Sequence, residues 1–332
     1  MWGTLHRVRR ALATLGVSFI LMSPSLGDRI DLTKPGASPP PLPEAALVDS
    51  DRTYKLDLIE AMEKPPQLLI FGGSRATRFD PAYFEQVTGL RAFNAAFPVG
   101  RPSDAWAITR YCLQRHPRIR LRCFWAIQPS LFQDRQMDPG LVQDQRLSRA
   151  FDQQTIDEAA AEQIATMGED KPALWTPPGY AEDGRLIYNY YDYLESQGRT
   201  LDTAIRQWVS LMLGHQPEKP YQGTSWRPNQ LYFARTLALM NSIGVRPVIV
   251  IMPTHPQGIE LLGEEAWRTQ QERLQDALDE LATRYDFALL DYSRIESFDG
   301  DPNNFYDGVH VKAENARRIV DAAVRDAPDA LR

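Results

Sequence analysis

The sequence predicts an α/β fold in three layers, α/β/α, in which a parallel five-stranded sheet carries helices on both faces and a large, mostly helical insertion. Two observations carry this prediction. Short apolar runs without polar alternation recur along the chain, as expected of strands that are covered on both faces. Amphipathic segments of helix length separate most of these runs, which is the pattern of a parallel sheet with crossover helices.

Composition restricts the class further. The 332 residues are 43% hydrophobic and 24% charged, which excludes a largely disordered, collagen-like or multi-span membrane chain. A formal net charge of -6 offers no basic footprint for nucleic acid. Two cysteines, Cys112 and Cys123, are too few for a disulfide-dense scaffold or a four-cysteine zinc site. One bridge between them and two buried thiols remain as alternatives.

The N-terminal residues 1–27 predict export. Basic residues precede an uncharged segment whose apolar part is shorter than the roughly 20 residues of a spanning helix. Ser25 and Gly27 are small and suit cleavage before Asp28, so the segment is a signal peptide or an uncleaved membrane anchor. Basic residues flanking an apolar segment stay on the cytoplasmic side of the membrane. We therefore expect the residues after this segment to be exported, to a periplasmic or extracellular location. Because residues 1–27 hold three arginines and no acid, the exported part has 34 basic and 43 acidic residues, a net charge of -9.

A proline-rich linker is expected over residues 28–50. Its centre, 34–43, contains five prolines and is typical of a stiff extended chain. The globular domain then occupies 51–332.

Apolar runs set the expected strands, at 67–71, 92–97, 120–127, 247–252 and 287–291. Amphipathic spacing sets the expected helices, at 54–62, 81–87, from 103 onward, 228–243, 264–285 and 312–327. The helix at 81–87 shows the local signals most fully. Asp80 is a good N-cap, Pro81 suits the first helical position, and Gly89 ends the helix.

Residues 128–227 do not follow the alternation of strands and helices. They hold helical segments at 155–167 and 203–213 between turns rich in proline and glycine. We interpret them as an insertion between the third and fourth strands, lying over the active edge of the sheet. Aromatic residues such as Tyr191 and Trp208 favour packing of the insertion onto the sheet, with sugar-binding platforms as the alternative.

Residues suited to chemistry follow the strands, at the edge where parallel sheets bind ligands. Ser74 ends the first strand in a glycine turn, a good position for a nucleophile, although serine is also an ordinary turn residue. Asp307 and His310 follow the last strand, three residues apart, so the carboxylate can orient an imidazole toward a serine hydroxyl. The alternative is that Asp307 only caps the final helix.

The motifs at these positions resemble those of the SGNH/GDSL hydrolase superfamily. Residues 71–75, Phe-Gly-Gly-Ser-Arg, look like its first block, and residues 307–310, Asp-Gly-Val-His, look like its D-x-x-H block. Residues 93–100 are similar to its second block, with Gly73 replacing the aspartate of the first. The third block, Gly-x-Asn-Asp, is absent, and residues 125–129 stand in its place. The likeness is greatest to exported members with one anchor, such as lipoteichoic acid D-alanyl transfer proteins and polysaccharide O-acetyl enzymes.

That resemblance implies a flavodoxin-like fold and a role for each matching residue. Ser74 would be the nucleophile, His310 the general base and acid, and Asp307 its orienter. The resemblance implies an oxyanion hole formed with the Ser74 amide; its remaining donors are taken from the second block and from the position after the third strand, namely Gly100, Asn94 and Gln128. Two residues at the active edge are expected to contact substrate: Arg75 and His255.

We therefore expect an exported serine esterase or acyltransferase acting on acyl esters of envelope or extracellular glycans through an acyl-enzyme. Its substrate would be an acylated carbohydrate or a lipid-linked ester. The alternative is a catalytically degenerate binding or assembly protein that helps a membrane partner protein modify a cell-envelope polymer. No cofactor and no nucleic acid are expected, and no ligand spacing specifies a metal site at His255, Asp307 and His310.

Overall fold

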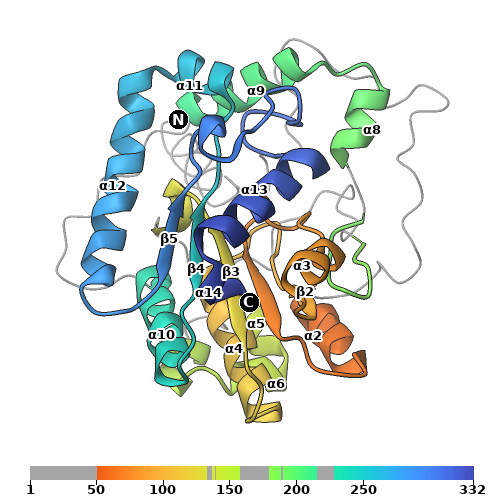
Figure 1. The fold of residues 1–332 in the computed structure, drawn as a ribbon, viewed down its shortest axis with the longest axis vertical. Helices are drawn as coiled ribbons and strands as arrows, with labels where there is room; N and C mark the ends of the chain where they lie inside the picture. The colour runs from red at the N-terminus through yellow and green to blue at the C-terminus, as the bar shows by residue number, and fades with distance from the viewer. Residues whose placement is uncertain (1–50, 133–136, 139, 158–178, 188–189, 215–227) are drawn as a thin grey trace, which may run out of the picture.

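A computed structural model of the chain describes residues 51–132, 137–138, 140–157, 179–187, 190–214 and 228–332. Within them a five-stranded sheet runs through the centre, with helices on both faces (Figure 1). Every strand pair is parallel, and the strand order is β2-β1-β3-β4-β5. The three-layer α/β prediction is confirmed. This order reverses direction beside β1, so the ligand crevice is expected between the carboxyl ends of β1 and β3.

The strands lie where the apolar runs predict them, and no end differs by more than three residues: β1 Leu68–Gly72, β2 Ala92–Asn94, β3 Arg122–Ile127, β4 Val248–Ile251 and β5 Ala288–Asp291. β2 is shorter than predicted. Its backbone still contacts β1 beyond Asn94, because the Ala95 N–H donates to Ile70 O at 2.8 Å and the Phe97 N–H donates to Gly72 O at 3.2 Å.

Helices of the predicted set are α2 Asp51–Ala61, α3 Pro81–Thr88, α4 Pro102–Arg115, α10 Pro228–Ser242, α12 Glu264–Ala282 and α13 Ala313–Asp326. Short elements that were not predicted are α11 Pro256–Leu262, α14 Pro328–Leu331 and the 3₁₀ turns η3 Pro129–Phe132 and η4 Ile295–Phe298. The start and end of α3 match the sequence signals. Asp80 accepts a hydrogen bond from the Ala82 N–H, and Gly89 ends the helix in the left-handed conformation.

Alternate residues of each strand face two separate cores. Leu69, Phe71 and Trp125 pack with α2, α4, α10 and α12 on one face of the sheet. Ile70 and Phe124 pack with α3, α13 and α14 on the other. Strands buried on both faces explain why the runs in the sequence are continuous and do not alternate. The cysteines belong to the first core, where both are buried, free thiols.

The insertion reaches two places. Its helices α8 Tyr190–Ser196 and α9 Leu201–Gly214 lie near the carboxyl ends of the strands, and α9 packs beside α11 (Figure 1). Its helices α5 Gly140–Gln143 and α6 Gln145–Ser148 pack instead against α2 and α4. The expectation that the whole insertion covers the active edge is therefore wrong for these two helices.

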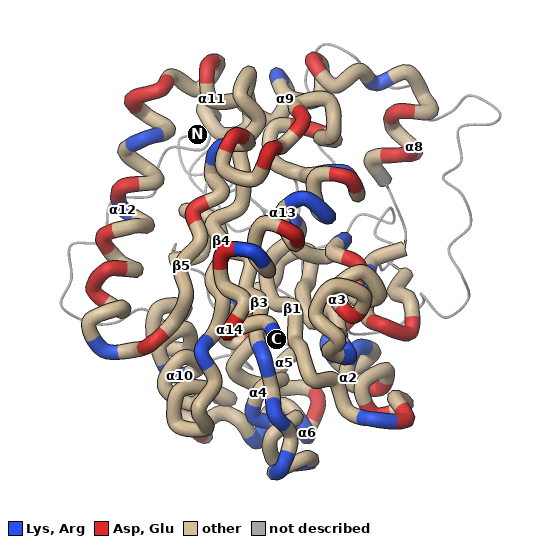
Figure 2. The backbone as a smooth tube through the Cα atoms, in the orientation of Figure 1, with Lys and Arg blue, Asp and Glu red and all other residues tan. Residues whose placement is uncertain are grey.

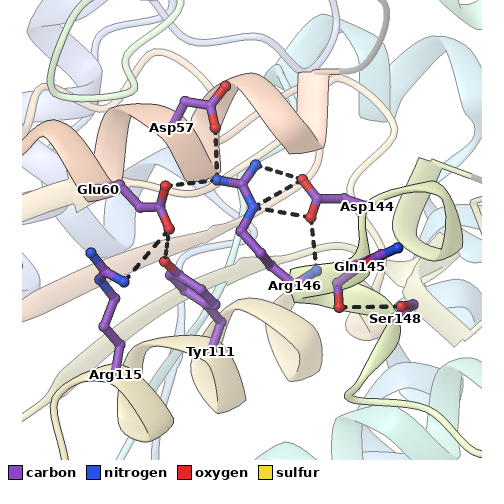
Figure 3. Close-up of polar contacts among 8 residues, drawn as sticks. All are labelled: Asp57, Glu60, Tyr111, Arg115, Asp144, Gln145, Arg146 and Ser148. Atoms are coloured by element: carbon purple, nitrogen blue, oxygen red, sulfur yellow. Dashed lines mark hydrogen bonds and ion pairs between the residues drawn. The ribbon is translucent and has the colours of Figure 1, made fainter.

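Arg146 holds this first part of the insertion in place. Its guanidinium pairs with Asp144 at 2.6 Å and reaches across to Asp57 and Glu60 of α2, each at 2.8 Å (Figure 3). Glu60 also accepts a hydrogen bond from the Tyr111 hydroxyl of α4. Arg146 thus joins α6 to α2, and Glu60 joins both to α4.

Several predictions fall outside the described residues: the export signal, the linker and most of the helix expected at 155–167. Among the residues that are described, no helix is both long and apolar enough to cross a membrane.

Candidate active site

Three side chains predicted from separate parts of the chain meet at the carboxyl edge of the sheet. Ser74 Oγ lies 2.9 Å from His310 Nε2, across 236 positions of sequence. His310 Nδ1 lies 2.8 Å from Asp307 Oδ2 and 3.0 Å from Asp307 Oδ1. Asp307 and His310 are buried, and Ser74 is half-buried. The spacing predicted for a serine, a base and an orienting carboxylate is thus present in the structure.

The loop that carries Asp307 and His310 is closed on itself. Phe305 and Val311 form an antiparallel bridge, and the Tyr306 N–H donates to His310 O at 2.8 Å. Asp307 Oδ1 accepts from the backbone N–H groups of Val309 at 2.8 Å and His310 at 2.9 Å. The carboxylate therefore organises its own turn while its second oxygen faces the imidazole. α13 begins only at Ala313, so Asp307 caps the loop and not the helix.

The electrostatics of Asp307 fix the tautomer of His310. Burial alone would raise the pKa of Asp307, but the His310 ring and the N–H groups of Val309 and His310 outweigh burial and lower that pKa. An ionised carboxylate only accepts hydrogen bonds, so His310 Nδ1 carries the proton. His310 Nε2 is then an acceptor for the Ser74 hydroxyl, which is the arrangement a general base requires.

Two of the three predicted oxyanion donors are wrong. The Asn94 side chain is fully buried, and its amide nitrogen donates to Ala76 O and Phe79 O, both at 2.9 Å. Asn94 therefore holds the loop after Ser74 in shape and does not face a substrate. The Gly100 N–H donates to Phe97 O at 2.9 Å, which closes a turn.

Gly100 is required for a packing reason instead. A Cβ at this position would lie 2.0 Å from Gly72 O, so only glycine lets the second loop approach the end of β1.

Two donors remain at the serine. No hydrogen bond within the described residues uses the Ser74 N–H. Gln128 follows β3, the strand that pairs with β1, and Ser74 follows β1. The Gln128 amide nitrogen donates to Ser130 Oγ at 2.7 Å, which uses one of its two hydrogens. Gln128 stays a predicted donor.

His255 is buried and uses both ring nitrogens within the protein, which argues against the predicted contact with substrate. It is 6% exposed. Nδ1 accepts from the Gln257 N–H at 3.1 Å as the N-cap of α11, so Nε2 carries the proton and donates to Pro302 O at 3.0 Å. The His255 N–H donates to Gly308 O at 2.9 Å. His255 thus holds the segment that carries Asp307 and His310 at two points, Pro302 and Gly308.

Arg75 is half-buried beside Ser74, and one of its terminal nitrogens, Nη1, donates to Pro253 O at 3.4 Å. Burial lowers the pKa of Arg75 to about 10, and the charge of Asp307 partly opposes this. Its contact with substrate stays a prediction.

Sequence reasoning gave no role at the site to two neighbours of His310. The Tyr191 hydroxyl lies 3.1 Å from His310 Nδ1, and its ring stacks on Tyr306 with centroids 5.4 Å apart. Trp208 packs on Gly308, inside a small cluster with Ile205 and Val309. Packing was the favoured interpretation for the aromatic residues of the insertion, and Trp208 confirms it.

Lys55 was also missed. It is fully buried, and its ammonium group donates to Asn94 O at 2.8 Å and to Ala96 O. Burial lowers the pKa of Lys55 well below its ordinary value. The signal was present in the sequence, because Arg52, Lys55 and Ile59 share the helical spacing of a buried face.

No family model matches the chain, and no curated protein matches it in sequence. Among the described residues, no three His, Cys, Asp or Glu side chains converge in a way that could hold a metal ion.

Proposed function

We propose that this protein is an exported serine esterase or acyltransferase that acts on acyl esters of envelope or extracellular glycans. The observation that carries the proposal is the continuous hydrogen-bond chain from Ser74 through His310 to the buried carboxylate of Asp307. A neutral serine hydroxyl needs a base, and a group that orients this base, in order to act as a nucleophile. A serine that only forms a turn needs neither.

The chemistry follows from this chain. Ser74 Oγ attacks the ester carbonyl carbon while His310 Nε2 takes the hydroxyl proton. The carbonyl oxygen becomes an oxyanion, and the bond from carbon to the alkoxy oxygen then breaks. His310 returns the proton to the departing alcohol and leaves an acyl ester on Ser74. A water molecule or a second hydroxyl repeats the sequence and releases the acyl group as an acid or as a new ester.

Oxyanion stabilisation is assigned to the Ser74 N–H, with Gln128 as the second donor. Loss of one such donor typically costs about 2.7–4 kcal/mol of transition-state stabilisation. Gln128→Ala is therefore expected to slow acylation by roughly a hundredfold or more.

A serine-reactive fluorophosphonate tests the proposal. The wild-type protein is expected to be labelled at Ser74, and Ser74→Ala is expected to lose the label. Ser242→Ala is the matched control, because Ser242 is exposed at the end of α10 and its hydroxyl donates only to Leu239 O. Absence of labelling in the folded wild-type protein would refute the acyl-enzyme.

One observation favours a second candidate, a binding or assembly protein of the cell envelope. The amides of Asn94 and Gly100 are both used within the protein, which leaves fewer oxyanion donors than the resemblance implies. A wild-type protein that is folded and unlabelled would support this candidate.

A further inference from the structure

Positively charged side chains gather around the two tyrosines beside His310. The Lys312 ammonium lies 5.2 Å from the centre of the Tyr306 ring, and the Arg78 guanidinium lies 5.1 Å from it. Arg78 also donates to the Tyr306 hydroxyl at 3.3 Å. The Arg199 guanidinium lies 6.0 Å from the Tyr191 ring. We call Arg75, Arg78, Arg199 and Lys312, with the stacked Tyr191 and Tyr306, the basic rim.

The basic rim is continuous with the serine. The Tyr191 ring lies 5.0 Å from the His310 ring, and His310 contacts Ser74 directly. Arg75 follows Ser74 in the chain, and Arg78 lies on the same loop. A substrate placed with its ester at Ser74 would therefore extend over these cations.

Carboxylates only partly balance this charge. Glu195 pairs with Lys312 at 2.7 Å, and Asp192 is exposed and acts on Arg78 at longer range. In the described part of the chain, no carboxylate lies within ion-pair distance of Arg75 or Arg199, and Arg199 Nε is buried without a hydrogen-bond partner. Arg75 and Arg78 are both half-buried, and burial lowers the pKa of each guanidinium.

The rim contrasts with the charge of the whole molecule. The chain carries a net charge of -6, and its acidic residues are prominent elsewhere, for example along α12 (Figure 2). A protein with a negative net charge repels polyanions unless a local cluster of cations attracts them. Arginine is suited to planar carboxylate or tetrahedral phosphate groups, and Arg199 Nε has no hydrogen-bond partner among the described residues.

We propose that the basic rim binds an anionic group of the substrate, so that the glycan acted on at Ser74 is acidic. The group is a sugar carboxylate or a phosphate of the polymer backbone, which share this recognition chemistry. The inference rests on the proposed function, since it names the charge of the substrate for the same site.

Calorimetric titration of the full chain carrying Ser74→Ala tests the inference without turnover. The probes are trigalacturonate, a glycerol phosphate trimer and neutral cellotriose. At least one charged probe is expected to bind, more weakly as salt rises, and to bind at least tenfold more tightly than cellotriose. The charged probe that binds more tightly distinguishes a carboxylated from a phosphorylated polymer.

Arg199→Gln, added to Ser74→Ala, is expected to weaken binding of the charged probe about tenfold, the effect of one lost charged hydrogen bond. Arg246→Gln is the matched control. It removes the same charge at the amino end of β4, from an exposed arginine paired with Asp286. Binding of cellotriose as tight as that of the charged probes, or equal effects of the two arginine substitutions, would overturn the inference. So would binding of neither charged probe.

The outcomes separate this inference from the proposed function. If the protein binds an anionic probe but fluorophosphonate does not label it, the inference about the basic rim is supported and the acyl-enzyme is refuted. If Ser74 is labelled but no anionic probe binds, the acyl-enzyme is supported and the inference about the basic rim is refuted.

Discussion

Gly308 and Trp208 offer the sharpest test of how the insertion supports the site. The Trp208 indole of α9 lies against two glycines of the body, Gly258 and Gly308. A Cβ on Gly308 would lie 2.1 Å from indole Cε3 and 2.5 Å from Cδ2. Carbon atoms in contact normally stay about 3.5 Å apart, so Gly308→Ala requires a shift of about 1.4 Å. Either α9 moves outward or the loop with Asp307 and His310 moves inward.

The expected magnitudes follow from this clash. Gly308→Ala should lower the free energy of unfolding by about 1–3 kcal/mol, as overpacking does. Trp208→Ala should lower it by about 3–5 kcal/mol, because a buried indole is lost. In the double variant the added methyl group enters emptied space, so the clash disappears. The double variant should therefore be about 1–3 kcal/mol more stable than additivity predicts.

Urea unfolding followed by circular dichroism measures these energies, and the rate of fluorophosphonate labelling measures the site. A loop shift of this size stretches the 2.9 Å contact between Ser74 and His310, so labelling of Gly308→Ala should slow about a hundredfold. Additive unfolding energies, within about 0.5 kcal/mol, would refute the packing of Trp208 on this loop.

Three other predictions concern the scaffold. Arg146→Ala should lower the free energy of unfolding by about 1 kcal/mol, and high salt should reduce the difference, since its ion pairs are partly exposed. His255→Asn keeps an N-cap but loses the bond to Pro302 O. Burial lowers the pKa of His255, so its stabilisation is complete above pH 6.5, the ordinary value, and is lost as pH falls through the folded-state pKa. In urea titrations from pH 7.5 to 5, the free energy of unfolding of the wild type should fall as the pH falls, and that of His255→Asn should fall less. Because burial raises the pKa of Cys112 to about 12, and that of Cys123 also, neither thiol should react with a disulfide reagent at pH 8 until urea is added. Rapid reaction of the folded protein would contradict their burial.

The sequence predicted most of the sheet because β1 to β4 are buried on both faces and therefore appear as continuous apolar runs, whereas β5 is only partly buried. It placed Ser74, Asp307 and His310 at one edge because parallel strands direct their carboxyl ends the same way. Short elements such as α11 were missed, since a seven-residue helix shows barely two turns of periodicity. The direction of α5 and α6 was missed because it depends on Arg146 finding partners on α2, a tertiary contact that local pattern does not encode.

The errors at the site have one physical cause. Asn94 and Gly100 were predicted as oxyanion donors from the resemblance of residues 93–100 to the second block, and His255 was predicted to contact substrate from its position after the fourth strand. Position at the active edge does not decide where a donor points, because the loops there must also satisfy their own carbonyl groups. Asn94 satisfies Ala76 and Phe79, while its own carbonyl is satisfied by Lys55.

A buried lysine on α2 is therefore connected, through one asparagine, to the loop that presents Ser74. On the proposed function, this connection explains why polar groups so close to Ser74 bond within the protein. They hold Ser74 in position, and no hydrogen bond among the described residues uses the Ser74 N–H, which the proposal assigns to an oxyanion.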